Sequence, residues 1–297
     1  MSLKHNRKAR VALLSIGSNT TLIIMKVVAG ILSGSVSIIS EAIHSSMDLL
    51  AAIIAFFSVR ASSKPADEDH PYGHGKIENI SGIIEGLLIM VAAILIVREA
   101  IHKIIAPTPI EQKWVAIFVM VVSAVTNWFV SRKLYKVAKE EDSIALEADA
   151  LHLKTDVYTS LGVALGLGLV VLTGQNILDA VAAIIVGCII LKESVELCKK
   201  AMGPLLDARL SENEEEKIRI ALLEYREKFI DFHQLRTRKS GKIKYIDFHL
   251  TVEKNLTVEE SHELCEVLEG EIEALLSNTS VSIHIEPGEE RRHYRNI

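Results

Sequence analysis

Six long apolar stretches lie within the first 206 of the 297 residues, and they constrain the fold more than any other feature of the chain. A helix of about 20 mostly apolar residues crosses the hydrocarbon core of a bilayer. The stretches are residues 11–32, 36–59, 79–104, 113–136, 145–172 and 177–199. They exclude both a single soluble globule and a disordered chain. We therefore expect an α-helical membrane domain with six transmembrane helices over residues 1–206.

Basic residues occur at alternate ends of these stretches. The N-terminal arm and the links 60–76 and 132–139 carry Lys and Arg, whereas the links 33–35 and 173–176 carry none. Cytoplasmic links of membrane proteins are enriched in basic residues. This asymmetry predicts a multi-pass protein of the inner or plasma membrane with both termini in the cytoplasm.

The last third of the chain, residues 207–297, differs in composition, with 14 basic against 20 acidic residues and no long apolar stretch. The pattern Ser211-x-x-Glu214 predicts the start of a helix over 211–229. Alternating apolar residues predict strands at 231–238, 243–253 and 279–286, with a helix at 257–277 between the last two. The order αββαβ predicts a small cytoplasmic α/β domain. A net charge of −5 gives no support for a nucleic-acid partner.

Two of the apolar stretches contain ionisable pairs, His44 with Asp48 and His152 with Asp156. Each pair has i, i+4 spacing, so both side chains leave one helix face. Charges inside a bilayer are costly and persist mainly where they have a partner or a function. If the two faces meet, two imidazoles and two carboxylates suit tetrahedral Zn²⁺, or Cd²⁺, Fe²⁺ or Co²⁺. Cu⁺ prefers sulfur and Mg²⁺ or Ca²⁺ prefer oxygen ligands.

Several interpretations of these pairs remain open at this stage. The pairs could be hydrogen-bonded couples that tie helices together or the ligands of a metal transport site. They could equally belong to a metal sensor without flux or to an intramembrane metal-dependent hydrolase. No general base stands beside the pairs, which favours transport over an enzyme. Metal binding competes with protons at all four groups, so proton-for-metal antiport is a hypothesis.

The link after the second stretch contains another possible ligand cluster. It reads Asp67-Glu-Asp-His70-Pro-Tyr-Gly-His74-Gly-Lys76, with glycine and proline typical of a turn. Asp67, His70 and His74 offer one carboxylate and two imidazoles within eight residues. The alternative interpretation is a solvated polar loop.

Together, the two His-x-x-x-Asp pairs, the Asp-His-Pro-Tyr-Gly-His-Gly-Lys loop and the six-helix-plus-tail layout resemble the cation diffusion facilitator family over almost the whole chain. The resemblance implies a homodimer in the lipid bilayer that removes Zn²⁺ from the cytoplasm in exchange for protons and uses no organic cofactor. It places the transport site on His44, Asp48, His152 and Asp156, and a loop site on Asp67, His70 and His74. His44 resembles the more zinc-selective pattern, with Fe²⁺, Cd²⁺, Co²⁺ and Mn²⁺ left open.

For the tail, the resemblance implies a ferredoxin-like, metallochaperone-like domain with a regulatory metal site. The residues that match this site are His233, His249, His262, His284 and Glu286. Ile285 stands between the last two and cannot coordinate a metal through its side chain. Lys76 and Asp207 match positions that form an interlocking charge pair in the dimer.

Overall fold

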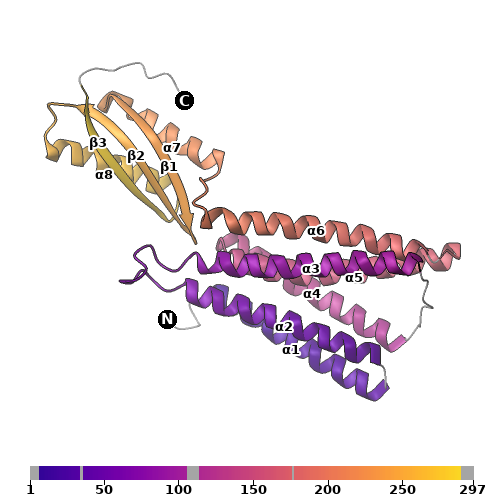
Figure 1. Ribbon diagram of the computed structural model, residues 1–297. Helices are drawn as coiled ribbons and strands as arrows, with labels where there is room; N and C mark the ends of the chain where they lie inside the picture. The colour runs from indigo at the N-terminus through magenta and orange to yellow at the C-terminus, as the bar shows by residue number, and fades with distance from the viewer. Residues whose placement is uncertain (1–6, 34–35, 106–113, 176, 289–297) are drawn as a thin grey trace. The chain divides into compact units, whose positions relative to one another are not determined.

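The computed structural model describes residues 7–33, 36–105, 114–175 and 177–288, and the chain divides into two compact units, Met1–Met202 and Gly203–Ile297. Six long helices make up the described part of the first unit (Figure 1). They are α1 (Arg7–Ser33), α2 (Val36–Ser62), α3 (Ile77–Ile105), α4 (Trp114–Glu140), α5 (Ile144–Thr173) and α6 (Ile177–Leu205). Each predicted stretch is a helix, and most of these helices extend past the apolar run into its charged flanks.

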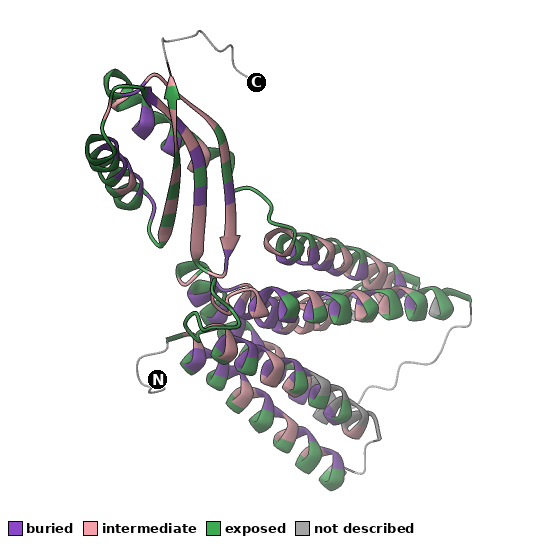
Figure 2. Cartoon of the chain, turned by 60° about the vertical axis from the view of Figure 1, so that its left-hand side comes forward, coloured by how far each residue is buried: buried purple, intermediate pink, exposed green. Residues whose placement is uncertain are grey.

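The helices bury several polar residues as well as an apolar core, and they leave many large apolar residues exposed. Ile31, Leu32 and Leu172 are largely exposed, whereas Glu85 and Asp149 are fully buried. Figure 2 shows exposed residues recurring along the outer faces of these helices. Among the described residues, Arg7–Leu32 and Ile77–His102 are long and apolar enough to cross a membrane. Apolar surface of this extent suits contact with lipid tails rather than water.

Two central helices, α2 and α5, carry the ionisable pairs and pack against each other. Helix α2 packs against α1, α3 and α5, and α5 packs against α2, α3 and α4. A cluster of buried apolar residues that includes Phe56, Leu134, Leu146 and Leu153 joins α2, α4 and α5. Asp48 of α2 and His152 of α5 therefore meet inside the bundle.

The second unit contains the predicted αββαβ order. Its elements are α7 (Glu212–Glu224), a 3₁₀ turn (Arg226–Lys228), β1 (Asp231–Ser240), β2 (Ile243–Glu253), α8 (Val258–Leu275) and β3 (Thr279–Gly288). The strand order is β1-β2-β3, with β1 antiparallel and β3 parallel to β2. Both helices begin with a capping box, on Ser211 and on Thr257.

The first helix of this unit ends earlier than the sequence predicts. Helix α7 stops at Glu224 rather than at residue 229, and the chain then makes a 3₁₀ turn. Phe229 follows in extended conformation and is buried in the core. Burial of this aromatic ring in the core favours the earlier end of α7. Helix propensity contains no information on that burial.

One face of the sheet forms the core of the second unit. Ile246, Phe248, Leu250 and Val252 of β2 are all buried, as the alternation predicts. They pack with Leu264, Leu268 and Ile272 of α8. Figure 2 shows the alternation of buried and more exposed residues along the strands. The residues between them, including His249, therefore lie on the opposite face of the sheet.

Candidate metal sites

The two intramembrane motifs meet at a contact between α2 and α5. Nε2 of His152 lies 2.9 Å from Oδ1 of Asp48. Asp48 is 5% exposed, and its backbone carbonyl accepts a hydrogen bond from Asn19 of α1 at 3.4 Å. Nδ1 of His152 is buried and has no hydrogen-bond partner among the described residues. Two ligands predicted from separate motifs are thus adjacent in the bundle interior.

Of the remaining two predicted ligands, Asp156 is held by a hydrogen bond to α4. Oδ2 of Asp156 accepts a hydrogen bond of 2.9 Å from Nδ2 of Asn127 on α4. His44 belongs to α2, but its side chain lies outside the described residues. Asn127 was missed by sequence reasoning, although a polar amide within the apolar α4 run was a usable signal. Its amide orients the Asp156 carboxylate, as hydrogen bonds around metal ligands commonly do.

The loop between α2 and α3 gathers its three predicted ligands. Asp67, His70 and His74 each offer an atom within 4.8 Å of the others. Oδ1 of Asp67 lies 3.1 Å from Nδ1 of His70, and Oδ2 lies 3.4 Å from Nε2 of His74. Nδ1 of His74 contacts the carbonyl oxygen of Pro65 at 3.2 Å, which fixes the ring and leaves Nε2 toward Asp67.

The turn in this loop and its hydrogen bonds favour the ionised form of the Asp67 carboxyl group. Gly73 adopts φ +77, and its amide donates to the carbonyl of His70 at 2.9 Å, which closes the turn. Desolvation opposes ionisation of Asp67, but hydrogen bonds from the backbone and ring of His70, with the charge of His74, lower the pKa of Asp67. An ionised carboxylate beside two imidazoles has the donor chemistry that Zn²⁺ takes.

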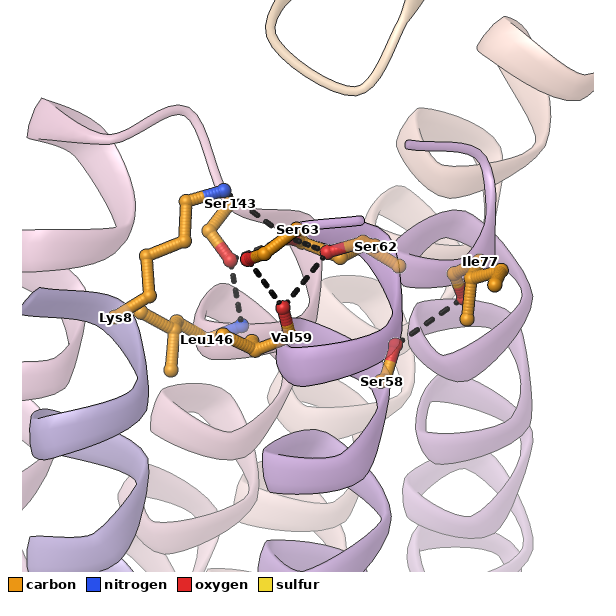
Figure 3. Close-up of polar contacts among 9 residues, drawn as sticks. Lys8, Ser58, Val59, Ser62, Ser63, Ile77, Ser143 and Leu146 are labelled. Atoms are coloured by element: carbon orange, nitrogen blue, oxygen red, sulfur yellow. Dashed lines mark hydrogen bonds and ion pairs between the residues drawn. The ribbon is translucent and has the colours of Figure 1, made fainter. Parts of the chain in front are cut away.

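A buried carboxylate at the start of α3, directly after this loop, joins α3 to α1, α2 and the start of α5. Glu78, in the first turn of α3, is 3% exposed. It accepts hydrogen bonds from Lys8 Nζ at 2.9 Å, from Ser62 Oγ at 2.7 Å and from Ser143 Oγ. Figure 3 shows Lys8, Ser62 and Ser143 converging from α1, α2 and the start of α5. Sequence reasoning assigned no role to Glu78, because a charge at a helix start has a solvated alternative.

Three histidines lie side by side across the polar face of the second unit's sheet. His233 pairs with His249 on the antiparallel ladder, and His249 pairs with His284 on the parallel one. Glu286 reaches all three: its oxygens lie 2.8 Å from Nδ1 of His249, 3.4 Å from Nε2 of His233 and 3.9 Å from Nε2 of His284. The hydrogen bond from His249 and the charges of the other histidines lower the pKa of Glu286.

Local backbone geometry contributes to this cluster. The β1–β2 register shifts between His233 and Arg236, where Gln234 has φ +53. Such a bulge re-aims the neighbouring side chains. Ligand atoms of His233, His249 and Glu286 lie within 4.8 Å of one another.

Two further predicted residues lie elsewhere. His262 stands on α8, which packs on the apolar face of the sheet, and its Nε2 is 3.5 Å from Glu266. The structure therefore does not bring His262 to the three-histidine cluster of its own chain, because sequence matching carries no information on which face a helix covers. Asp207 lies 3.8 Å from Arg238 within the second unit. Lys76 belongs to the first unit, so the charge pair of Lys76 with Asp207 stays a prediction.

Comparison with known proteins agrees with this combination of a polar-cored helical bundle and an αββαβ tail. The family model described as the cation efflux transmembrane domain matches residues 12–206, and the one described as the cation efflux protein cytoplasmic domain matches residues 210–288. An uncharacterized transporter of Synechocystis is 34% identical, over 96% of this chain and 92% of that protein. The cation-efflux pump FieF of Shewanella oneidensis is 31% identical, over 92% of each chain. A solved structure of CzrB, presented there as a candidate zinc transporter in its zinc form, is 36% identical with a TM-score of 0.27, covering 29% of this chain and 97% of that one.

The fold and the family matches define a membrane transporter for metal cations. The chain belongs to the cation efflux family, also called the cation diffusion facilitator family. The predicted resemblance and the predicted fold class, a helical membrane domain followed by a small α/β domain, are therefore confirmed.

Proposed function

We propose that the chain exports Zn²⁺ from the cytoplasm in exchange for protons, through a tetrahedral site of His44, Asp48, His152 and Asp156. The observation that carries this proposal is the 2.9 Å contact between Nε2 of His152 and Oδ1 of Asp48. It brings together a nitrogen and an oxygen ligand from two motifs that are about 100 residues apart in the chain. Mixed nitrogen and oxygen ligands favour Zn²⁺ and similar ions such as Cd²⁺, Fe²⁺, Co²⁺ and Mn²⁺ over Mg²⁺ or Ca²⁺.

The same contact supports proton exchange. The hydrogen bond between the imidazole of His152 and the carboxylate of Asp48 holds a proton. A metal ion at the same place needs a neutral imidazole and an ionised carboxylate, so it competes with that proton. Metal arriving from the cytoplasm displaces that proton, and protons arriving from the other side displace the metal. Helices that rock around a fixed central site expose it to each side in turn. In this proposal both termini and the second unit lie in the cytoplasm, as the basic links predict, and no enzymatic step is required.

Flux through the purified full-length protein in proteoliposomes tests the proposal. With protons more concentrated in the compartment that receives the metal, we expect Zn²⁺ uptake reported by an enclosed fluorescent indicator, together with a countermovement of protons. Uptake that ignores the imposed pH gradient would contradict antiport. Zn²⁺ binding without any flux would instead support a sensor, and competition by the other four ions in the same assay ranks selectivity.

We further propose that the protein works as a homodimer whose cytoplasmic units respond to metal. The support is the cluster of His233, His249, His284 and Glu286, whose donor atoms already converge in the chain. Metal shared by two cytoplasmic units favours one arrangement of the dimer and so couples metal load to transport. In that arrangement His262 reaches metal only through a second copy, and Lys76 with Asp207 forms a charge pair at the interface.

Replacing His249 by alanine is expected to lower Zn²⁺ affinity of the cytoplasmic cluster by at least about tenfold. The affinity of the unaltered cluster is expected to fall as the pH is lowered, because protons compete with metal for its ligand atoms. Metal counting and light scattering on the full chain measure binding and dimer mass, with His102→Ala as the matched control. Equal metal content in both variants would count against the cluster.

A further inference from the structure

Two carboxyl groups that take no part in the proposed metal site are completely buried in the bundle. They are Glu85 of α3 and Asp149 of α5, each 0% exposed. Ser81 donates to Oε1 of Glu85 at 3.2 Å, and Ser15 of α1 donates to Oδ1 of Asp149 at 3.1 Å. The other oxygens, Oε2 of Glu85 and Oδ2 of Asp149, are buried without a hydrogen-bond partner among the described residues. Each carboxyl group thus has one buried oxygen that bonds to none of the described residues.

These two acids are electrostatic neighbours of each other and of the metal site. The charge of Glu85 interacts with those of Asp149 and His152, and the charge of Asp149 also interacts with that of Asp48. Helices α3 and α5 pack together, and Asp149 precedes His152 by one helical turn. His152 is already hydrogen-bonded to Asp48. Two bare carboxylates at this depth would repel each other and lack the hydration that water supplies, so one of them needs a bound cation.

The donor chemistry selects the proton as that cation. The hydrogen-bond partners of Glu85 and Asp149 among the described residues are serine hydroxyls, which are a poor match for the borderline metals that imidazole attracts. Within the described residues, the groups of three or more ligand atoms close enough to hold a metal ion are those of the loop and of the cytoplasmic sheet. A proton needs one oxygen and fits between buried acids without any ligand cage.

We propose that Glu85, paired with Asp149, is a proton-binding site separate from the four metal ligands, and that it loses its proton when metal binds beside it. The proposal rests on the proposed proton-coupled transport. Metal adds two positive charges next to His152, and charges interact strongly across a low-dielectric interior. The O–H bond of Glu85 then breaks, Glu85 keeps the electron pair as carboxylate, and the proton passes to water. The new negative charge partly offsets that of the metal.

Proton release on metal binding tests this assignment in the purified full-length protein. Zn²⁺ is titrated into weakly buffered samples that contain a pH indicator. Glu85→Gln keeps the size and hydrogen-bonding capacity of the side chain but removes its proton, so we expect about one proton fewer released per transported ion bound. Glu99→Gln, at an exposed position of the same helix, is expected to match the parent. Protons released at the loop and sheet sites are common to all samples and cancel.

Infrared difference spectra provide a readout that does not depend on transport. The parent is expected to lose a protonated-carboxyl band on Zn²⁺ binding, and Glu85→Gln is expected to lack that change. If Glu85→Gln fails to fold, Glu85→Asp keeps a titratable group and is expected to retain both the band and the parent proton count.

Results that contradict the role of Glu85 can be distinguished from results that contradict the proposed transport function. An unchanged proton count and an unchanged band in Glu85→Gln would overturn the assignment. Loss of a bound metal ion in Glu85→Gln, measured by metal analysis, would make the pair a metal subsite and would also overturn it. A parent protein that carries Zn²⁺ without protons in proteoliposomes refutes the proposed function itself. A parent that couples normally, with Glu85→Gln coupling equally well, refutes this inference alone.

Discussion

Replacement of Asp48 by asparagine is expected to reduce Zn²⁺ flux in proteoliposomes by about 100-fold or more, since even residues that support metal ligands contribute 10- to 100-fold. Asparagine has nearly the same size and keeps a hydrogen bond to His152 possible. It lacks the negative charge that attracts a divalent cation in a low-dielectric interior, and its amide is a poor ligand for Zn²⁺. The flux loss should therefore come from ligand chemistry rather than from packing.

Two companion variants make that result specific. Glu196→Gln, at an exposed position of α6, removes an acidic charge outside the site and is expected to leave flux unchanged. Asn127→Leu removes the hydrogen bond to Asp156 and is expected to cost about 10- to 100-fold. Flux of Asp48→Asn equal to that of Glu196→Gln, with the helical content of both intact, would contradict the proposed transport site.

Replacement of Glu78 by alanine is expected to cost about 3 kcal/mol of stability. The change leaves three donors, on Lys8, Ser62 and Ser143, without their shared acceptor. Lys8 is largely buried, its side chain being 14% exposed, so its ammonium group keeps little access to water. Removing one partner of a buried ion pair leaves an uncompensated charge, which costs more than the pair itself contributed.

Denaturant unfolding of the full-length protein in detergent, followed by circular dichroism, measures this effect. Glu99→Ala, at an exposed position of the same helix, supplies the matched control and is expected to remain close to the parent. Because Glu78 joins α3 to α1, α2 and the start of α5, unfolding of the Glu78→Ala variant should also begin earlier at that end of the bundle. Equal midpoints for the two variants would show that the contacts of Glu78 carry no net stability.

Much of the fold follows from local patterns. The six apolar stretches predicted the six helices because bilayer thickness sets a minimum length that few other structures satisfy. The β2 strand, Ile243–Glu253, was predicted at its exact bounds because its alternation is regular. Helix α7 was predicted too long, because the turn before Phe229 depends on that ring entering a core assembled from distant residues.

The candidate sites were also predictable only in part: the residue types followed from the sequence, but the contacts between them did not. The identities of Asp48, His152 and Asp156 were predictable, because ionisable residues in apolar sequence are rare and costly. The meeting of Asp48 with His152 was not, since no local pattern states which faces of α2 and α5 pack together. Asn127 and Glu85 escaped sequence reasoning for a related reason: a single polar residue in a long helix has an ordinary interpretation until its neighbours are known.

The sequence by itself determined which part of the protein faces lipid and which faces water. It also determined the helices and strands, and the types of ligand available to a metal. Those properties depend on spacing within one element and on the chemistry of single side chains. The tertiary structure decided the alignment of His233, His249 and His284 across three strands, and the complete burial of Glu85 and Asp149. Strand register and helix packing involve residues far apart in the chain, so these contacts exist only once the whole unit has folded.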